Sequence, residues 1–431
     1  MYNIQDFGAV GNGESLCTAA IQKALDTCAA AGGGSVVVPP GRYLTGTIYL
    51  RSHVHLHLEL GAELLASADM ADYNAPDAFA QNSASKEEGS NGGHLLIGLE
   101  VEDVALSGPG AINGNGPAIF GPLTPGQRKW PCMARPGQLV FFCECAGIRV
   151  QDLTLSDATY WTLFVHGCEN VQIRGLRIFN NVATPCGDGI DIDSSRNVTV
   201  SDCVIDTGDD CITLRGNWDR LKRKTPCENV AISNCVLKSI ANGVRVGVGG
   251  GVIRNCVISN LSISDSHNGV CVESRYKQFH EGVEIDNIHL SNITMDVGMP
   301  IYLSAGVGGK GFVHDVHFSN ISGVARKGSC FRGEAGRKVR DITLDNFCFE
   351  YRGGAGLIQD PSEPSDPVWD PSPSRPHALF FSHAEGAVLR NCRIRWGETN
   401  APWRGALHAE HCADIKIAEC ELPPPPEAAR L

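Results

Sequence analysis

The feature of this sequence that most constrains its fold is a short phrase that recurs along the chain. A turn residue precedes two or three alternating apolar positions, and Asn, Asp or Cys follows them. Copies begin at Asn170, Asn197, Asn229, Val252, Asn287, Asp315, Asp341, Ala387 and Asp414. Short strands of period two that recur every ~20 to 45 residues, with loops of varied length, are typical of a β-solenoid.

Each position of the phrase has a structural role in such a coil. The alternate Val, Ile and Leu point inward, and Asn or Asp tolerates the bend at the coil corner. Cysteines in inward slots, such as Cys203, Cys235, Cys256 and Cys392, behave as small hydrophobic residues. We therefore expect the 18 cysteines to be mostly buried free thiols and the repeated Asn residues to be structural.

A solenoid also accounts for the length of 431 residues, because each coil packs only on its neighbours. We predict an all-β protein with one parallel β-helix domain over residues 1–422 and a disordered tail over 423–431. Within the domain we expect an N-terminal cap and first coils (1–65), loop insertions (68–136), central coils with the active site (137–358) and C-terminal coils (359–422).

Two kinds of segment depart from the repeat. The apolar spacing from Leu16 to Ala31 predicts an amphipathic helix, which would cover the open end of the first coil. Three polar, Gly- and Pro-rich stretches are aperiodic and predict long loops: Ala68–Gly93, Asn115–Pro136 and Asp360–Pro376.

The formal net charge of -12 disfavours nucleic acid and anionic membranes as partners. No apolar run reaches the roughly 18 to 20 residues of a membrane span. The first residues show no basic region followed by an apolar one, so we expect a cytoplasmic protein. A removed signal peptide would leave the same sequence.

Acidic residues gather between Cys186 and Gly216, and this cluster is the strongest chemical signal in the chain. Its members are Asp188, Asp191, Asp193, Asp209 and Asp210. Asp188 and Asp209 stand about one coil apart, so we expect them to stack on adjacent coils within a few ångströms.

Crowded carboxylates repel one another, which favours one protonated acid beside an ionised neighbour. That pairing suits hydrolysis of a glycosidic bond, in which one group protonates the leaving oxygen and another activates water. Structural corner ladders and calcium binding are the alternative roles. We assign the structural role to Asp193 and a functional role to Asp209 and Asp210.

Several motifs also resemble a known family, and they follow its order along nearly the whole chain. They are DFGAVGNG at the start, GGGSVVVPPGRY, GAINGNG at Gly110, GDGID at Gly187 and GDDC at Gly208. This pattern resembles glycoside hydrolase family 28, the polygalacturonase family. The resemblance implies a right-handed parallel β-helix and inverting hydrolysis without a metal or other cofactor.

By that resemblance Asp209 is the general acid, and Asp188 and Asp210 activate water. The family's Asn and Thr ahead of the first aspartate are Cys186 and Gly187 here, a change that leaves the carboxylate in place.

The chain departs from the family at the positions that meet the substrate. The family's Gly-His-Gly histidine corresponds to Asn242, and both bases of its Arg-Ile-Lys element are replaced, by Cys271 and Glu273. Those bases meet a uronate carboxylate, which Glu273 would repel. We therefore expect this divergent member to bind a different sugar beside the acid, one that is neutral.

Nearby residues offer other contacts to a substrate. Arg215, Arg245 and Arg275 could bind hydroxyls or a displaced carboxylate, or could pair with the acids. Tyr160 and Trp161 precede the acids by one coil and are the better candidates for stacking on a sugar. We expect Trp130 and Tyr302 to serve in packing, and His94 and His166 to be ordinary polar neighbours.

The sequence thus predicts an inverting, exo-acting glycoside hydrolase of a pectin-related or other plant oligosaccharide, with insertions closing one end of the cleft. A calcium-assisted polysaccharide lyase, using Asp188, Asp191, Asp209 and Asp210 as ligands and an Arg as base, is the second candidate. A non-catalytic carbohydrate-binding β-helix is the third.

Overall fold

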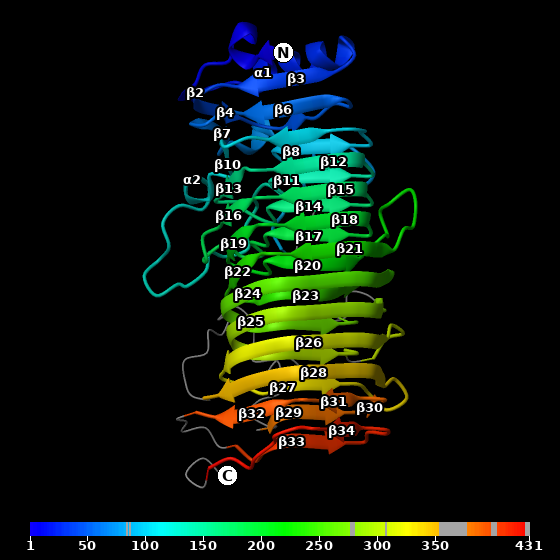
Figure 1. Ribbon diagram of the computed structural model, residues 1–431. Coiled ribbons are helices and arrows are strands. Elements are labelled where there is room, and N and C mark those ends of the chain that lie inside the picture. Colours follow the sequence, from blue (N-terminus) through cyan, green and yellow to red (C-terminus); the bar gives the residue numbers. More distant parts are fainter. Residues whose placement is uncertain are drawn as a thin grey trace. The chain divides into compact units, whose positions relative to one another are not determined.

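The computed structural model describes residues 1–82, 85, 88–275, 281–306, 308–352, 377–397 and 403–426. The chain forms two compact units. Parallel β-strands make up most of each unit (Figure 1). Unit 1 comprises Met1–Asp209 and Trp218–Thr225, and unit 2 comprises Asp210–Asn217 and Pro226–Leu431. Whether residues 1–422 act as one domain stays a prediction.

Unit 1 holds the described helices and the first nineteen strands. The helices are η1 (Ile4–Phe7), α1 (Thr18–Ala30), η2 (Met70–Asp72) and α2 (Gly116–Phe120). The strands are β1 (Tyr2–Asn3), β2 (Asn12–Leu16), β3 (Gly34–Val38), β4 (Gly41–Thr45), β5 (Ile48–Tyr49), β6 (Val54–Leu58), β7 (Ala62–Ala66), β8 (Leu96–Leu99), β9 (Ala105–Ser107), β10 (Ala111–Asn113), β11 (Val140–Cys143), β12 (Ala146–Gln151), β13 (Thr154–Ser156), β14 (Leu163–His166), β15 (Glu169–Arg174), β16 (Arg177–Phe179), β17 (Ile190–Asp193), β18 (Arg196–Ser201) and β19 (Val204–Thr207).

Unit 2 holds the other described strands, of which β24 and β25 are the longest. They are β20 (Ile212–Gly216), β21 (Cys227–Ser233), β22 (Val236–Ser239), β23 (Asn242–Gly249), β24 (Val252–Glu273), β25 (Glu284–Ser304), β26 (Val313–Ala325), β27 (Ser329–Arg332), β28 (Val339–Tyr351), β29 (His377–Ser382), β30 (Ala384–Glu385), β31 (Val388–Arg390), β32 (Arg393–Trp396), β33 (Gly405–Glu410) and β34 (Lys416–Ala418).

Within each unit, a strand pairs in parallel with the equivalent strand of the next coil, as the predicted solenoid requires. In unit 1, β8, β11, β14 and β17 form one such series. Its inward residues, for example Val140, Leu163 and Ile190, are fully buried. The alternate residues, such as Phe164 and its partner Asp191, face the opposite side of the same sheet.

The corner role predicted for Asn and Asp is confirmed. Asn170, Asn197, Asn229, Asn287 and Asp315 all have φ between 53° and 57°, in the left-handed region. Asn and Asp tolerate that conformation better than other residues with a side chain, because their short polar groups bond locally. The recurring phrase therefore marks bends of the coil, and these bends lie within the bounds of strands such as β15, β18 and β25.

Helix α1 matches the predicted cap with one correction at its start. Its buried residues are Ile21, Ala24, Leu25 and Cys28, and it packs against β3 at the N-terminal end of unit 1 (Figure 1). The prediction placed Leu16 in the helix, whereas Leu16 ends β2 and pairs with Leu44 of β4. Leu16 therefore pairs in the sheet, although helical spacing alone would place it in the helix.

The insertions are confirmed as largely irregular where the structure describes them. Ala68–Gly93 contains only η2 and isolated bridges, and Asn115–Pro136 contains α2. The third predicted loop, Asp360–Pro376, lies outside the described residues. Residues 423–426 carry no strand, and the rest of the predicted tail is likewise outside the described part.

All 18 cysteines are free and most are buried, including Cys203, Cys235, Cys256 and Cys392. This outcome confirms the prediction of structural thiols. In the part of the chain that the structure describes, every helix is too short or too polar to cross a bilayer.

Candidate active site

Two of the predicted catalytic carboxylates lie close together in unit 1. A carboxylate oxygen of Asp188 lies within 4.8 Å of one of Asp209. Asp188 is 4% exposed and precedes β17, whereas Asp209 is half-buried and follows β19. The predicted stacking of these two residues on adjacent coils is confirmed, and both lie on one flank of the helix.

Backbone contacts hold the segments that carry Asp188 and Asp209 in place. The carbonyl oxygen of Asp188 accepts from the backbone N–H of Thr162 at 2.9 Å and from its hydroxyl at 2.8 Å. A Cβ atom at Gly208 would lie 2.9–3.0 Å from the carbonyl oxygens of residues 181, 182 and 184. Only glycine therefore fits before Asp209, where the two turns pack together.

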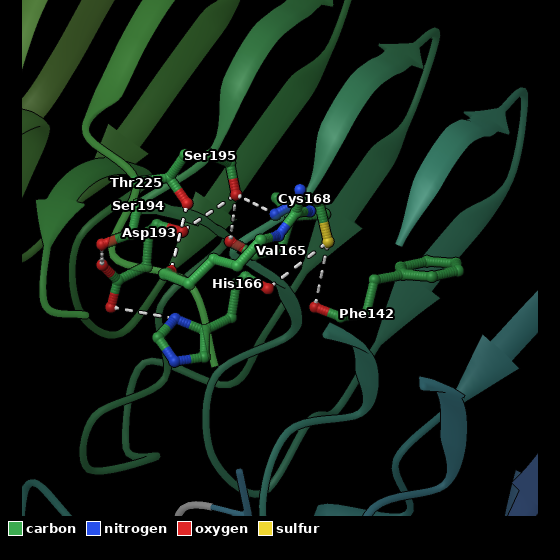
Figure 2. Close-up of polar contacts among 9 residues, drawn as sticks. Phe142, Val165, His166, Cys168, Asp193, Ser194, Ser195 and Thr225 are labelled. Carbon is green, nitrogen blue, oxygen red and sulfur yellow. Dashed lines mark hydrogen bonds and ion pairs between the residues drawn. The ribbon is translucent and has the colours of Figure 1, made fainter. Parts of the chain in front are cut away.

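Asp193 forms a buried pair with His166 on the neighbouring coil (Figure 2). Nδ1 of His166 lies 3.5 Å from Oδ2 of Asp193, and both side chains are buried. The hydroxyl of Ser194 donates to the other carboxylate oxygen at 3.1 Å. These contacts agree with the structural role assigned to Asp193.

Unit 2 gathers four of the predicted site residues into a buried polar cluster. Asp210, its first residue, accepts a hydrogen bond at Oδ1 from the amide of Asn242 at 2.5 Å. The guanidinium of Arg245 lies 3.4 Å from Oδ2 of Asp210 and 3.5 Å from a carboxylate oxygen of Glu273. All four residues are nearly inaccessible to solvent. Arg245 thus takes the pairing role, one of the two roles predicted for it.

The two other arginines are half-buried and also belong to unit 2. Arg215 belongs to β20, and Arg275 follows β24. The Arg275 side chain lies against the glycine turn at Gly308 and Gly309. Their binding of substrate stays a prediction.

Tyr160 and Trp161 are buried rather than open to a ligand. Their rings stack on each other at 4.9 Å, and the Tyr160 hydroxyl donates to the carboxylate of Glu88. The guanidinium of Arg135 lies 5.3 Å from the centre of the Tyr160 ring and donates to the Glu88 carbonyl oxygen at 2.7 Å. Both insertions therefore cover this aromatic pair, and a sugar would stack on it only after they move.

Other residues take the packing roles expected for them. Trp130 stacks on Phe120 at 4.7 Å, and Tyr302 is 1% exposed in a cluster with Met299. His94 is fully buried and shares a hydrogen bond with Asn82 at 2.8 Å. Its burial lowers the pKa of the imidazole to about 3, so this histidine stays neutral at physiological pH.

The carboxylates of Asp188 and Asp209 are close enough to share a hard cation, since calcium prefers such oxygen ligands. Acidic pairs of this kind also occur without an ion. Hydrolysis by an acid and a base needs no metal, so sensitivity to a chelator separates the two uses of the same carboxylates.

The exposed thiol of Cys132 lies in the second insertion, Asn115–Pro136. A hydrogen bond with the Cys186 thiol lowers the pKa of Cys132 to about 6, and the positive charges of Arg135 and Lys129 act in the same direction. Cys132 is therefore mostly thiolate at pH 7 and protonated below pH 6.

We expect iodoacetamide to alkylate Cys132 before any other cysteine, with a rate that rises through a midpoint near pH 6. Peptide mass mapping after short exposures at pH 5, 6, 7 and 8 measures this rate. The Cys132→Ser variant should lose the fast reaction. Equal labelling of half-buried Cys412 at pH 7 would contradict the expectation.

Sequence reasoning missed three residues that contact the predicted site residues. Asn268 donates to Asn242, while Glu88 and Arg135 hold Tyr160 from the insertions. Asn268 follows Asn242 by one coil, so the coil spacing was a usable signal for it. No periodicity marks the two loop residues.

Two family models match this chain. A family model described as "Glycosyl hydrolases family 28" matches residues 65–356. A second model, described as "Rhamnogalacturonase A/epimerase, pectate lyase-like", matches residues 1–58. Together these matches begin with the N-terminal cap and run through the coils that carry the acidic cluster.

Similar curated proteins carry polygalacturonase names. The chain is 32% identical to a probable polygalacturonase of Vitis vinifera over 50% of its own length and 44% of that protein. It is 23% identical to an exopolygalacturonase of Zea mays over 82% of the chain and 84% of that protein. The chain thus aligns with less than half of the Vitis protein.

Solved structures support the fold. An exopolygalacturonase from Thermotoga maritima superposes with a TM-score of 0.66 and 19% identity, covering 96% of this chain and 91% of that one. A family 28 exopolygalacturonase from Yersinia enterocolitica gives a TM-score of 0.71 and 18% identity, covering 96% and 77%. The predicted fold, the right-handed parallel β-helix, is confirmed.

Proposed function

The chain belongs to glycosyl hydrolase family 28, and we propose that it hydrolyses a pectin-related oligosaccharide from one chain end, with inversion and without a metal. The observation that carries this proposal is the approach of Asp188 and Asp209 within 4.8 Å in unit 1. Asp210 follows Asp209 directly in the chain. The resemblance assigns the third carboxylate of the mechanism to this residue.

The exposures of these residues suit the roles that the resemblance implies. Asp209 is the most exposed of the three and transfers its proton to the leaving glycosidic oxygen. Asp188 and Asp210 are buried acceptors, and they take the proton of the water that attacks the anomeric carbon from the opposite face. The bond to the leaving oxygen breaks as the bond to water forms.

The stereochemistry of the reaction is proposed from the family resemblance. Inverting enzymes usually separate acid and base by about 6.5–9.5 Å, and retaining enzymes by about 5–5.5 Å. The 4.8 Å limit for Asp188 and Asp209 applies to one oxygen of each carboxylate and does not measure the separation of the two carboxyl groups. We favour inversion because the resemblance implies two carboxylates sharing one water. Proton NMR of the first-formed anomer tests this choice.

The sugar beside the acid is proposed to be neutral. Arg245 lies next to Cys271 of the following coil and could have replaced the lost bases, but it is held between Asp210 and Glu273. A cation between two carboxylates leaves the group with one net negative charge. That charge disfavours a uronate, whose carboxylate needs an available cation.

Action from a chain end is supported by the closed sheet face of unit 1. Ile97, Phe141 and Phe164 lie on the same sheet face as Asp191, and all four residues are buried. Phe79 of the first insertion stacks on Phe141, with ring centres 6.0 Å apart, and Leu221 packs on the same cluster. A sugar chain therefore has no open path over β8, β11 and β14.

The test is release of reducing sugar from matched oligosaccharides. We would compare oligogalacturonides with the same oligomers reduced to neutral galactosides, and with neutral pectic side chains, each with and without EDTA. We expect single sugars or disaccharides from a neutral substrate, undiminished by EDTA. A preference for the uronate would contradict the altered specificity, while a calcium-dependent product absorbing ultraviolet light would indicate a lyase.

A further inference from the structure

We propose that Asn268 is a positioning residue for Asp210, and this inference rests on the proposed function of Asp210 as a water-activating carboxylate. Asn268 does not touch Asp210. It acts through Asn242, whose amide it holds in the one orientation that donates a hydrogen bond to Asp210.

The three residues form a continuous hydrogen-bonded line inside unit 2. Nδ2 of Asn268 donates to Oδ1 of Asn242 at 2.8 Å, and Nδ2 of Asn242 donates to Oδ1 of Asp210 at 2.5 Å. Asn242 in β23 is the direct parallel partner of Asn268 in β24. Each of the three residues is at most 4% exposed, so water competes little for these bonds.

The chemistry of the amide explains why Asn268 matters. An asparagine side chain carries an acceptor oxygen and a donor nitrogen that exchange places when the group turns by half a rotation. With Asn268 donating to its oxygen, Asn242 can only present its NH₂ group to Asp210. A turned amide would instead place its oxygen against the carboxylate, which is electrostatically unfavourable.

Asp210 is then held at both oxygens. Asn242 contacts Oδ1, and Arg245 lies 3.4 Å from Oδ2. Two fixed partners restrict the rotation of the carboxylate and therefore aim its remaining lone pairs. A group that must receive a proton from one water molecule gains from such orientation.

Asn268 itself is unfavourably placed as a purely structural residue. Its own Oδ1 is buried and has no hydrogen-bond partner among the described residues. A buried acceptor without a partner lowers stability, and such groups call for an explanation. Turning the Asn268 amide would bring two oxygens together at Asn242, so the observed orientation serves the donation to Asn242.

Bonds between asparagines of successive coils also occur on the outer surface of unit 2. Asn260, in the same strand β24, donates to Asn234 at 3.3 Å, and Asn292 donates to Asn260 at 3.1 Å. These residues are exposed, whereas Asn242 and Asn268 are buried. Asn260 therefore provides a matched control with the same type of bond in the same strand.

The experiment is a double-mutant cycle measured by kcat and KM on the best substrate of the panel. We expect Asn268→Ala to lower kcat about tenfold, the loss of one oriented hydrogen bond, with KM changed less than about twofold. Asn242→Ala should lower kcat at least as much. Adding Asn268→Ala to Asn242→Ala should have no further effect, because the path runs through Asn242.

The control and the isosteric variant keep the proposal falsifiable. Asn260→Ala should leave kcat unchanged. Asn268→Asp has the same size but lacks the donor, so it should also lower kcat even if Asn268→Ala folds poorly. Wild-type kcat in Asn268→Asp, or fully additive losses in the double variant, would overturn the role of Asn268 while leaving hydrolysis established.

Other results would contradict the proposed function itself. If the wild-type protein cleaves nothing in the panel, or if Asp210→Asn retains full activity, the role of Asp210 is wrong and the inference about Asn268 falls with it.

Discussion

Asp209→Asn is expected to lower kcat by about 10²–10⁴-fold on natural oligosaccharides, the range that general acid catalysis contributes. Asparagine keeps the size of the side chain but cannot transfer a proton to the leaving oxygen. The other two carboxylates remain, so water activation continues while departure of the sugar slows. Binding of the substrate should change little, because the amide still offers hydrogen bonds.

Substrates with different leaving groups test the acid role of Asp209 more directly. An activated aryl glycoside departs without full protonation, so its hydrolysis should fall much less than that of the natural linkage. Asp202→Asn is the control, because Asp202 is exposed, belongs to unit 1 and has φ of 58°, which asparagine also tolerates. Equal losses on both substrates, or wild-type activity in Asp209→Asn, would contradict the acid role.

Arg245→Met is expected to destabilise the protein by about 3–5 kcal/mol, the typical loss when one partner of a buried ion pair is removed. Methionine fills much of the volume of the arginine stem, so the main loss is the charge between Asp210 and Glu273. Both carboxylates are buried, at 3% and 1% exposure, and water compensates poorly for the missing guanidinium. We also expect kcat to fall, because one oxygen of Asp210 loses its partner.

Thermal unfolding followed by circular dichroism measures this effect. Arg254→Met is the matched control, since Arg254 pairs with Glu228 at 2.8 Å in unit 2 but is 47% exposed, and such pairs contribute about 0–1 kcal/mol. Combining Arg245→Met with Glu273→Gln should recover part of the stability by removing one buried charge. Similar melting temperatures for Arg245→Met and Arg254→Met would contradict the expectation.

Much of the candidate site was accessible to sequence reasoning because it depends on the coil repeat. Asp188 and Asp209 are 21 positions apart, about one coil, and that spacing alone predicted their approach. The role of Arg245 could not be decided in this way. Whether its guanidinium meets a ligand or an acid depends on which side chains the next coil presents, and Glu273 became its partner through packing.

The aromatic pair Tyr160 and Trp161 also shows that coil spacing does not predict whether a side chain is exposed. Tyr160 and Trp161 stand one coil before the acids, as a sugar platform would, yet they are buried beneath Glu88 and Arg135. Both covering residues come from aperiodic insertions. Exposure of a side chain depends on what lies over it, and a loop without periodicity carries no signal of where it folds back.

The sequence by itself determined the coil, its corners and the stacking of the first two aspartates, because strand alternation and the left-handed preference of Asn and Asp are local properties of the chain. Only the tertiary structure decided the partners of Arg245, the cover over Tyr160 and the line from Asn268 to Asp210. Those features join residues from different coils and loops, and their energies depend on burial and orientation that exist only once the coils have packed.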